Sequence, residues 1–427
     1  MINKQIFREL LLKQKEQLSL KKDYIERELM NKIIDYLEDK RILIISGLRR
    51  AGKSTLVFEI INFLIKKKGS FCYVNFEDEK FLNFQAQDFE QLNEILIEIY
   101  GSSDYYFFDE IQNIEKFETF VRRLQDEGKK IIITGSNSSL LSKEFGTKLT
   151  GRYKMFELYP FSFLESLKYH LKVPEKTSFK TEDKAKLKEL FRNYIKFGGI
   201  PEYLKNKDPD YIRTLYEDII YRDIISRYSI KKQKVLRELV SILSGNISST
   251  FTYNSLKENL KIANAITIKE YISYLNNSYL FFEVLKLDYS IKKQLNSPRK
   301  IYIVDPAFSE FMGFNFSMNL GKILENIVFV ELKRRNKEIY YFSRKNECDF
   351  VIKEGNKILE VIQVCHQIND SNKEREIKGL IEAMREFKIK EGVILTFEDE
   401  DEFKYEEFKI KVKPVWKWLL EKDYGSK

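Results

Sequence analysis

Cysteine and histidine are scarce in this sequence of 427 residues, which has three cysteines and two histidines. The cysteines, at positions 72, 348 and 365, stand at unrelated spacings. A disulfide framework needs several cysteines in a short chain, and a structural zinc site needs cysteine and histidine ligands in paired motifs. The sequence therefore excludes both kinds of scaffold.

Long apolar runs are missing as well. Apolar segments such as residues 42–45 and 131–133 are far shorter than the roughly 20 residues that a membrane-spanning helix needs. The N-terminal segment is basic and amphipathic, carries Glu9 and Glu16, and has no continuous apolar stretch of the kind found in signal peptides. We therefore expect a cytoplasmic protein that has no membrane partner.

The composition is that of a folded chain, because hydrophobic residues make up 43% of it and charged residues 33%. The chain is too long for one ordinary core, and its length predicts two or three domains. Lysine and arginine outnumber aspartate and glutamate by 74 to 65, which leaves a net charge of +9. This charge fits either a polyanionic partner such as DNA or solvated lysine-rich helix faces, and charge alone does not decide between them.

One segment carries a specific chemical signature. Residues 47–54 fit the pattern G-x-x-x-x-G-K-[ST] and stand directly after an apolar segment and before an amphipathic one. In this pattern the glycines let backbone amides surround phosphates, the lysine reaches the β- and γ-phosphates, and the serine hydroxyl binds magnesium. We predict an ATP-binding P-loop rather than a chance turn, although a site that binds ATP without hydrolysing it fits the same motif. The predicted nucleotide-binding residues are Gly47, Leu48, Arg49, Arg50, Ala51, Gly52, Lys53, Ser54 and Thr55.

Two carboxylates follow the apolar residues 105–108. We predict that Asp109 binds magnesium together with Ser54, and that Glu110 orients and activates the attacking water. The alternative is a solvated strand end, which would be favoured for an Asp-Glu pair without a P-loop upstream.

Small polar residues follow the next apolar segment, residues 131–134. We predict that Asn137, with Ser136 as the second choice, contacts the γ-phosphate or the attacking water. A plain turn between a strand and a helix is the alternative, because small polar residues also favour turns.

Apolar segments alternate with amphipathic ones over the first part of the chain, which predicts a parallel sheet covered on both faces. The fold class is therefore α/β, with a P-loop NTPase sheet and helical lead-in over residues 1–160. Helical periodicity over residues 161–229 predicts a lid or linker. The order of helices and strands over residues 230–313 predicts a winged helix-turn-helix, and residues 314–427 predict a smaller α/β domain. The predicted strands of the first sheet are residues 42–45, 71–76, 105–108, 131–134 and 154–158.

Several motifs together resemble a known family. These are G-L-R-R-A-G-K-S-T, F-F-D-E-I-Q-N, T-G-S-N-S, L-T-G-R-Y-K-M-F-E-L-Y-P-F-S-F and G-G-I-P-E-Y-L. They are similar to prokaryotic AAA+-type ATPases that carry a winged helix and a C-terminal PD-(D/E)XK nuclease-like domain. The resemblance implies that Arg152 is a transition-state arginine, acting within its own chain or across a subunit boundary. A surface salt bridge is the alternative role for this residue.

The predicted recognition helix of the winged helix has a regular apolar face. Four residues follow the i, i+3, i+4, i+7 spacing of a buried stripe and leave a weakly basic face outside. The stripe consists of Ile268, Tyr271, Ile272 and Leu275, and the outer face of Thr267, Lys269, Ser273 and Asn276. We predict a wing whose basic residues either follow DNA phosphates or belong to a protein-docking module. These wing residues are Lys292, Lys293, Arg299 and Lys300.

The last domain carries Glu325, Asp349 and Glu360, whose arrangement resembles that of PD-(D/E)XK nucleases. Three such carboxylates can hold magnesium for phosphodiester hydrolysis. The family motif requires a lysine where this chain has Ile362, and Gln363 points to the opposite face of a regular strand. We therefore predict a degenerate, inactive nuclease-like fold that is used for binding.

Taken together, these patterns predict a magnesium-dependent ATPase of the AAA+ type that couples its nucleotide state to a DNA or protein partner. A homo-oligomer is compatible with this prediction. The first alternative is a nucleotide-gated binding switch with little turnover. The second alternative is an ATP-regulated DNA nuclease.

Overall fold

In this computed structural model the described residues are 3–20, 24–136, 151–171, 181–308, 320–368 and 373–421. The chain divides into two compact units, residues 1–158 and 159–427. Asn137, one of the predicted site residues, lies outside the described ranges.

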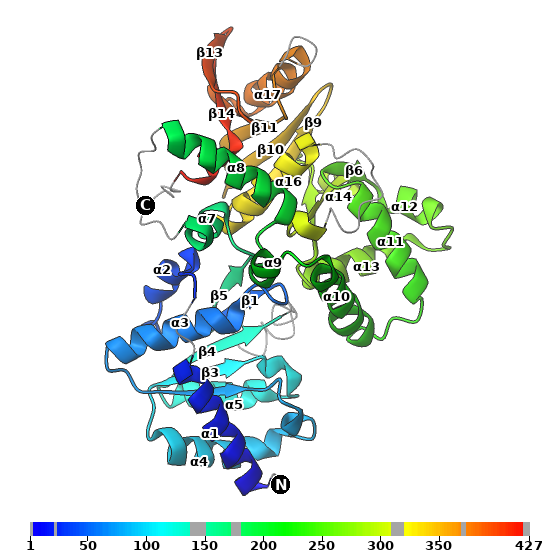
Figure 1. The fold of residues 1–427 in the computed structure, drawn as a ribbon. Coiled ribbons are helices and arrows are strands. Elements are labelled where there is room, and N and C mark those ends of the chain that lie inside the picture. Colours follow the sequence, from blue (N-terminus) through cyan, green and yellow to red (C-terminus); the bar gives the residue numbers. More distant parts are fainter. Residues whose placement is uncertain are drawn as a thin grey trace. The chain divides into compact units, whose positions relative to one another are not determined.

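The first unit is built on a parallel sheet of five strands in the order β2-β3-β4-β1-β5 (Figure 1). All five correspond to the apolar segments predicted from the sequence. Because every strand runs in the same direction, the residues that follow their carboxyl ends gather at one edge of the sheet. The strands are β1 (Ile42–Gly47), β2 (Phe71–Asn75), β3 (Tyr105–Asp109), β4 (Lys130–Gly135) and β5 (Tyr153–Leu158).

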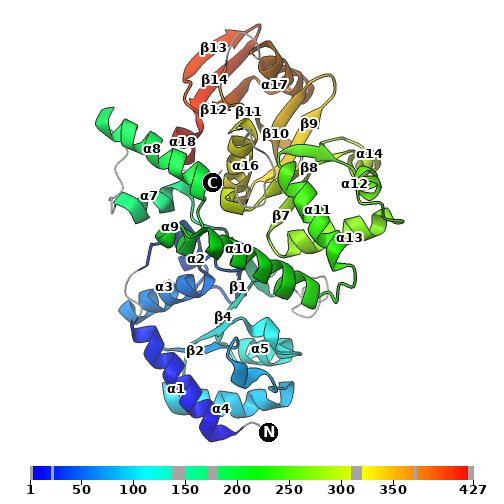
Figure 2. The same cartoon turned by 45° about the vertical axis from the view of Figure 1, so that its right-hand side comes forward.

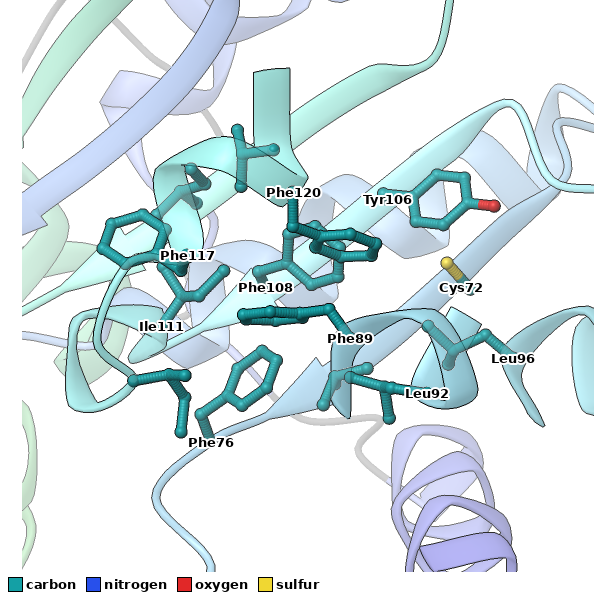
Figure 3. Close-up of a cluster of buried hydrophobic side chains, with 14 of the residues drawn as sticks. Cys72, Phe76, Phe89, Leu92, Leu96, Tyr106, Phe108, Ile111, Phe117 and Phe120 are labelled. Atoms are coloured by element: carbon teal, nitrogen blue, oxygen red, sulfur yellow. The ribbon is translucent and has the colours of Figure 1, made fainter. Parts of the chain in front are cut away.

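Helices cover both faces of this sheet, as the continuous apolar strands require. Alternate strand residues face opposite cores: Phe108 packs in one and Phe107 in the other. The first core is rich in aromatic rings, several of which are labelled in Figure 3. The rings of Phe89 and Phe120 are stacked, with their centroids 4.5 Å apart. The α-helices are α1 (Lys4–Leu20), α2 (Glu28–Ile34), α3 (Lys53–Lys66), α4 (Phe89–Tyr100) and α5 (Phe117–Asp126), and the 3-10 helices are η1 (Glu79–Phe81), η2 (Ala86–Asp88) and η3 (Ile111–Asn113).

The second unit begins with helices, as predicted. Among these helices, Gly198 and Gly199 pack closely against the side chain of Asp305. Gly198 has a φ of +66°, and a Cβ there would lie 1.7 Å from Oδ1 of Asp305. The amide of Gly199 donates a 2.7 Å hydrogen bond to Oδ2 of Asp305. Only glycine fits this close approach. The helices are α7 (Phe163–Leu171), α8 (Thr181–Phe197), α9 (Pro201–Asn206), α10 (Pro209–Asp218) and the π-helix η5 (Ile219–Ser226).

Next comes a three-stranded antiparallel sheet with the order β6-β8-β7 and helices before and between its strands (Figure 2). The predicted stripe of α13 is buried at all four positions, whereas Lys269, Ser273 and Asn276 are exposed. The short strand β6 and the helix α14 were not predicted. The elements are α11 (Gln233–Gly245), β6 (Ser249–Phe251), α12 (Tyr253–Asn259), α13 (Ala265–Asn277), β7 (Phe281–Leu285), α14 (Ile291–Asn296) and β8 (Arg299–Ile303).

The remaining elements form a mixed six-stranded sheet in the order β13-β14-β12-β11-β10-β9. A backbone hydrogen bond of 2.8 Å from Leu287 to Tyr341 joins the chain after β7 to β9. The three-stranded and six-stranded sheets therefore belong to one compact unit. The elements are α16 (Leu320–Arg334), β9 (Glu338–Ser343), β10 (Glu347–Glu354), β11 (Lys357–Val364), α17 (Lys373–Phe387), β12 (Glu391–Thr396), β13 (Asp401–Tyr405), β14 (Phe408–Pro414) and α18 (Val415–Leu419).

None of the helices within the described ranges is both long enough and apolar enough to cross a membrane.

Candidate nucleotide-binding site

The P-loop connects the carboxyl end of β1 to the first residue of α3. Its first glycine, Gly47, has a φ of +154°, and a Cβ there would lie 2.1 Å from the carbonyl oxygen of Leu158. Arg50 and Gly52 also have positive φ values, of 64° and 99°. The loop therefore makes a tight turn against the neighbouring strand β5 before the helix begins.

Lys53 points back into this loop. Its side chain is only 5% exposed, and Nζ donates hydrogen bonds of 3.2 Å to the carbonyl of Gly47 and 3.1 Å to that of Leu48. The ammonium thus lies at the helix N-terminus, where backbone amides and the helix dipole also favour an anion. The arrangement suits the binding of phosphate groups.

Asp109, the last residue of β3, is buried at the same edge of the sheet. Its carboxylate accepts hydrogen bonds from the hydroxyls of Thr134, Ser54 and Tyr73, the last at 3.0 Å. Burial raises the pKa of Asp109, and the charge of Glu110 raises it further, while these hydrogen bonds act in the opposite direction. The two predicted magnesium ligands, Ser54 and Asp109, are therefore in direct contact.

Glu110 follows with a left-handed backbone, φ +54°, which turns its side chain toward the P-loop. Its Oε1 lies 3.8 Å from Nζ of Lys53, and its Oε2 accepts hydrogen bonds from the amide of Ser136, at 3.2 Å, and from Gln112. Burial opposes ionisation, but the Lys53 charge and these hydrogen bonds outweigh it and lower the pKa of Glu110. The carboxylate is held ionised beside the loop.

Thr134, at the end of β4, was not predicted as a site residue. Its hydroxyl donates to Asp109 and also accepts the amide hydrogen of Glu110 at 3.1 Å. One buried hydroxyl therefore joins the carboxylate of Asp109 to the backbone amide of Glu110. The signal in the sequence is its place at the carboxyl end of an apolar strand, shortly before Ser136 and Asn137, which the sequence analysis predicted for this role.

Arg27 was also missed. It precedes α2, is buried, and donates a 2.8 Å hydrogen bond from Nη1 to the carbonyl of Ala51 in the P-loop. Its own amide donates to Oε2 of Glu59 at 3.3 Å. Nothing in the sequence near Arg27 indicated this role, because the contact joins segments more than 20 residues apart.

Arg152 lies away from this site. It precedes β5, whose last residue, Leu158, pairs with Gly47, so Arg152 stands at the amino end of the parallel strands, about 15–20 Å along the strand direction from the P-loop. Its guanidinium instead forms a 2.7 Å salt bridge with Asp126, and both side chains are exposed. The prediction that Arg152 acts on phosphates bound by its own chain is wrong. Its action across a subunit boundary stays a prediction.

Two residues of the predicted basic wing are not available to DNA. Arg299 stacks on the ring of Tyr253 and lies 3.7 Å from a carboxylate oxygen of Glu283. Lys300 is 1% exposed and is surrounded by carboxylates. Both belong to β8 of the sheet, whereas the sequence analysis counted them among the basic residues of a DNA-contacting wing. This part of the phosphate-tracking prediction is therefore wrong.

The predicted nuclease-like cluster forms with one change. Glu325 and Asp349 both contact Lys300, and the amide of Asp349 donates to Oε1 of Gln363 at 3.3 Å. Glu360 instead pairs with Ile352, further along β10 and on the opposite face from Gln363, because side chains alternate along a strand. Gln363 therefore belongs to this cluster, and the prediction that Glu360 does is wrong.

The residues at the P-loop fit magnesium-bound ATP. Around the P-loop, the described residues include no group of three or more histidine, cysteine or carboxylate side chains that could hold a metal ion. A P-loop does not need one, because magnesium there is held by one hydroxyl, one carboxylate and the phosphates themselves. The contact between Ser54 and Asp109 supplies such a pair.

Comparison with known proteins gives three consecutive matches. Residues 39–167 match the model of an AAA domain. Residues 188–316 match a domain of unknown function (DUF8612), and residues 320–418 match another (DUF4143).

Two relatives match along most of their length. "Uncharacterized protein MJ1544" of Methanocaldococcus jannaschii is 38% identical over an alignment 441 residues long, gaps included. The alignment covers 98% of this chain and 96% of the relative. An "Uncharacterized protein" of Haemophilus influenzae is 30% identical over 371 residues, which cover 84% of this chain and 90% of the relative. Among solved structures, AMPPCP-bound DnaA from Aquifex aeolicus aligns with a TM-score of 0.28 and 17% identity, over 58% of this chain and 86% of that one.

Proposed function

Because the chain belongs to the family of the M. jannaschii protein MJ1544 and its first unit contains an AAA domain, we propose that it binds ATP with magnesium and hydrolyses it. The observation that carries this proposal is the meeting of Lys53, Asp109 and Glu110 at one edge of the parallel sheet. These three groups perform separate tasks in phosphoryl transfer to water, and each has the surroundings that its task requires.

The P-loop amides and Lys53 bind the β- and γ-phosphates, and Lys53 shifts its hydrogen bonds from the loop carbonyls to the phosphate oxygens. Ser54 and Asp109 hold magnesium, which neutralises negative charge on the phosphates when it is bound. Glu110, ionised beside Lys53, accepts a hydrogen bond from the attacking water and takes up its proton. Thr134 holds the carboxylate of Asp109 in place against the backbone of Glu110.

Steady-state ATP hydrolysis with excess magnesium tests this proposal. Wild-type protein turns over ATP, and Lys53→Ala loses nucleotide binding because the P-loop lacks its cation. Lys66→Ala, an exposed lysine at the end of the same helix, is the matched control and keeps both activities. Tight ATP binding without turnover in the wild type would replace hydrolysis with a nucleotide-gated switch. Absence of binding would refute both versions.

The second unit supplies the partner-binding part of this proposed function. The order α11, β6, α12, α13, β7, α14, β8 supports a winged helix with an additional helix before its last strand, and Lys269, Lys292 and Lys293 are exposed. These three lysines could contact either DNA or an acidic protein surface, and they favour DNA as the partner only weakly. Binding to duplex DNA, measured with a non-hydrolysable ATP analogue at several salt concentrations, separates the two partners. Salt-dependent binding that weakens in Lys292→Ala/Lys293→Ala supports DNA, and no binding supports a protein partner.

Arg152 completes the ATP site only between copies of the chain. Its salt bridge to Asp126 is exposed, so little free energy is lost when the guanidinium turns to a neighbour's γ-phosphate. In a protein that self-associates, Arg152→Ala then lowers turnover per chain without changing ATP affinity. Unchanged turnover in the associated form would leave Arg152 as a surface ion-pair residue.

A further inference from the structure

A buried lysine stands at the centre of the carboxylate cluster in the second unit. Nζ of Lys300 lies 2.9 Å from Oε1 of Glu325, 2.8 Å from Oε1 of Glu347 and 2.8 Å from Oδ1 of Asp349. These are the distances of charge-assisted hydrogen bonds. The ammonium donates hydrogen bonds to Glu325 and Asp349 and forms an ion pair with Glu347.

The carboxylates come from two elements and the cation from a third. Glu325 lies on α16, Glu347 and Asp349 begin β10, and Lys300 lies on β8 of the three-stranded sheet. Glu325 and Asp349 are themselves buried, so without a cation their charges would repel each other in a medium of low polarity. The cluster therefore requires positive charge at this point.

Neighbouring groups hold the carboxylates in place independently of the lysine. The hydroxyl of Tyr302 donates to Oε1 of Glu325 at 2.7 Å. The amide of Val364 donates to Oδ2 of Asp349 at 2.9 Å, and this leaves Oδ1 directed at the cation. The arrangement of the oxygens is thus set by α16, β8 and β11 as well as by Lys300.

Converging carboxylate oxygens are also the ligands that magnesium, manganese and calcium prefer. We propose that the Lys300 ammonium takes the place of a divalent metal ion among Glu325, Glu347 and Asp349, and thereby keeps this domain from metal-dependent phosphodiester hydrolysis. A metal ion activates water because it has open coordination positions and a high charge. An ammonium carries a single charge and has no coordination position for water, so it offers neither.

The covalent attachment of the lysine explains why a metal ion does not displace it. A side chain fixed on β8 cannot diffuse away, so its effective concentration at the cluster is far above that of free metal in solution. Lys300 also ties the three-stranded sheet to the six-stranded one. This inference is independent of the ATP site. It means that the carboxylate cluster is occupied by a cation that belongs to the chain itself.

Removal of the lysine tests the proposal. We expect nucleotide-free Lys300→Ala to bind one Mn²⁺ per chain more than the wild type in electron paramagnetic resonance titrations, at least tenfold more tightly than any site of the wild type. The additional site disappears in Lys300→Ala/Asp349→Asn. Mn²⁺ also raises the urea midpoint of Lys300→Ala, followed by tryptophan fluorescence, and leaves that of the wild type unchanged.

Lys300→Ala alone places three carboxylates together without a cation and is expected to be less stable. Lys300→Ala/Glu347→Gln removes the half-exposed carboxylate as well, so the cluster keeps the net charge of the wild type and still has two ligands for Mn²⁺. If neither variant, once folded, gains a Mn²⁺ site, the proposal is overturned. It is equally overturned if the wild type binds a Mn²⁺ ion that Asp349→Asn abolishes.

Discussion

The ammonium of Lys53 lies 3.8 Å from Oε1 of Glu110, although the two residues are 57 positions apart. Lys53 begins α3 and Glu110 follows β3, so the contact depends on α3 beginning where β3 ends, at the same edge of the sheet. The positive charge contributes to the lowered pKa of Glu110 and keeps its carboxylate available as a proton acceptor. In the proposed function, the pair therefore links phosphate binding to activation of water.

This relationship predicts a separation of binding from hydrolysis in Glu110→Gln. The amide is nearly isosteric but does not take up a proton, so we expect a loss of about 10²–10⁴-fold in kcat. ATP affinity stays equal or increases, because Lys53 loses a competing negative charge. Turnover assays and equilibrium binding of a fluorescent ATP analogue measure the two quantities. Glu115→Gln, at an exposed position nearby, is the control, and equal losses in both variants would contradict the assigned role.

A second prediction follows from the hydrogen bonds of Thr134, which position Asp109 and Glu110. Thr134→Val keeps the shape but removes both hydrogen bonds, which leaves buried polar groups unsatisfied at a cost of about 1–3 kcal/mol. We expect turnover to fall about 10–100-fold, while Thr134→Ser, which retains the hydroxyl, stays close to the wild type. The comparison of kcat with thermal stability separates the two effects. A valine variant with normal turnover would show that Thr134 has no positioning role.

Gly47 predicts a steric effect. In Gly47→Ala the new Cβ would lie 2.1 Å from the carbonyl oxygen of Leu158, and β5 would have to move away from β1. We expect loss of ATP binding and destabilisation of the first unit by at least about 2 kcal/mol, measured by thermal unfolding followed by circular dichroism. Gly245→Ala, where a Cβ meets open space, is the control and changes stability by less than about 1 kcal/mol. Normal ATP binding in Gly47→Ala would contradict this geometry.

The buried carboxyl group of Asp305 predicts that the free energy of unfolding depends on pH. Burial raises its pKa from 3.8 to about 7, even though the amides of Gly199 and Ala307 donate to it. Since the folded state holds the proton more tightly, this contribution to stability is complete below about pH 4 and is lost as the pH rises to about 7. The free energy of unfolding therefore falls by up to about 1.4 kcal/mol per pH unit within this window.

Urea unfolding from pH 4 to pH 8 measures this effect, because the two tryptophans, Trp416 and Trp418, both lie in the second unit and report its unfolding. We expect the pH slope to decrease in Asp305→Asn. Asp401→Asn, at an exposed position on β13, keeps the slope of the wild type. The same slope in all three proteins would rule out Asp305 as its source.

The sequence was sufficient where a function depends on neighbours along the chain. The five strands of the first unit, the helix after Gly52 and the buried stripe of α13 all follow from local apolar patterns. The P-loop motif likewise holds all its residues within nine positions. These features could be predicted because their physical causes, side-chain periodicity and backbone freedom, lie within one short segment.

Tertiary structure alone decided which distant residues meet. The parallel register of β5 with β1 places Arg152 far from the P-loop. The pairing of β10 with β11 places Gln363, and not Glu360, beside Asp349. Lys300, which looks like a basic wing residue along the chain, became the buried centre of a carboxylate cluster. Strand order and register set these contacts, and both depend on packing between segments that are far apart in the sequence, where local patterns carry no information.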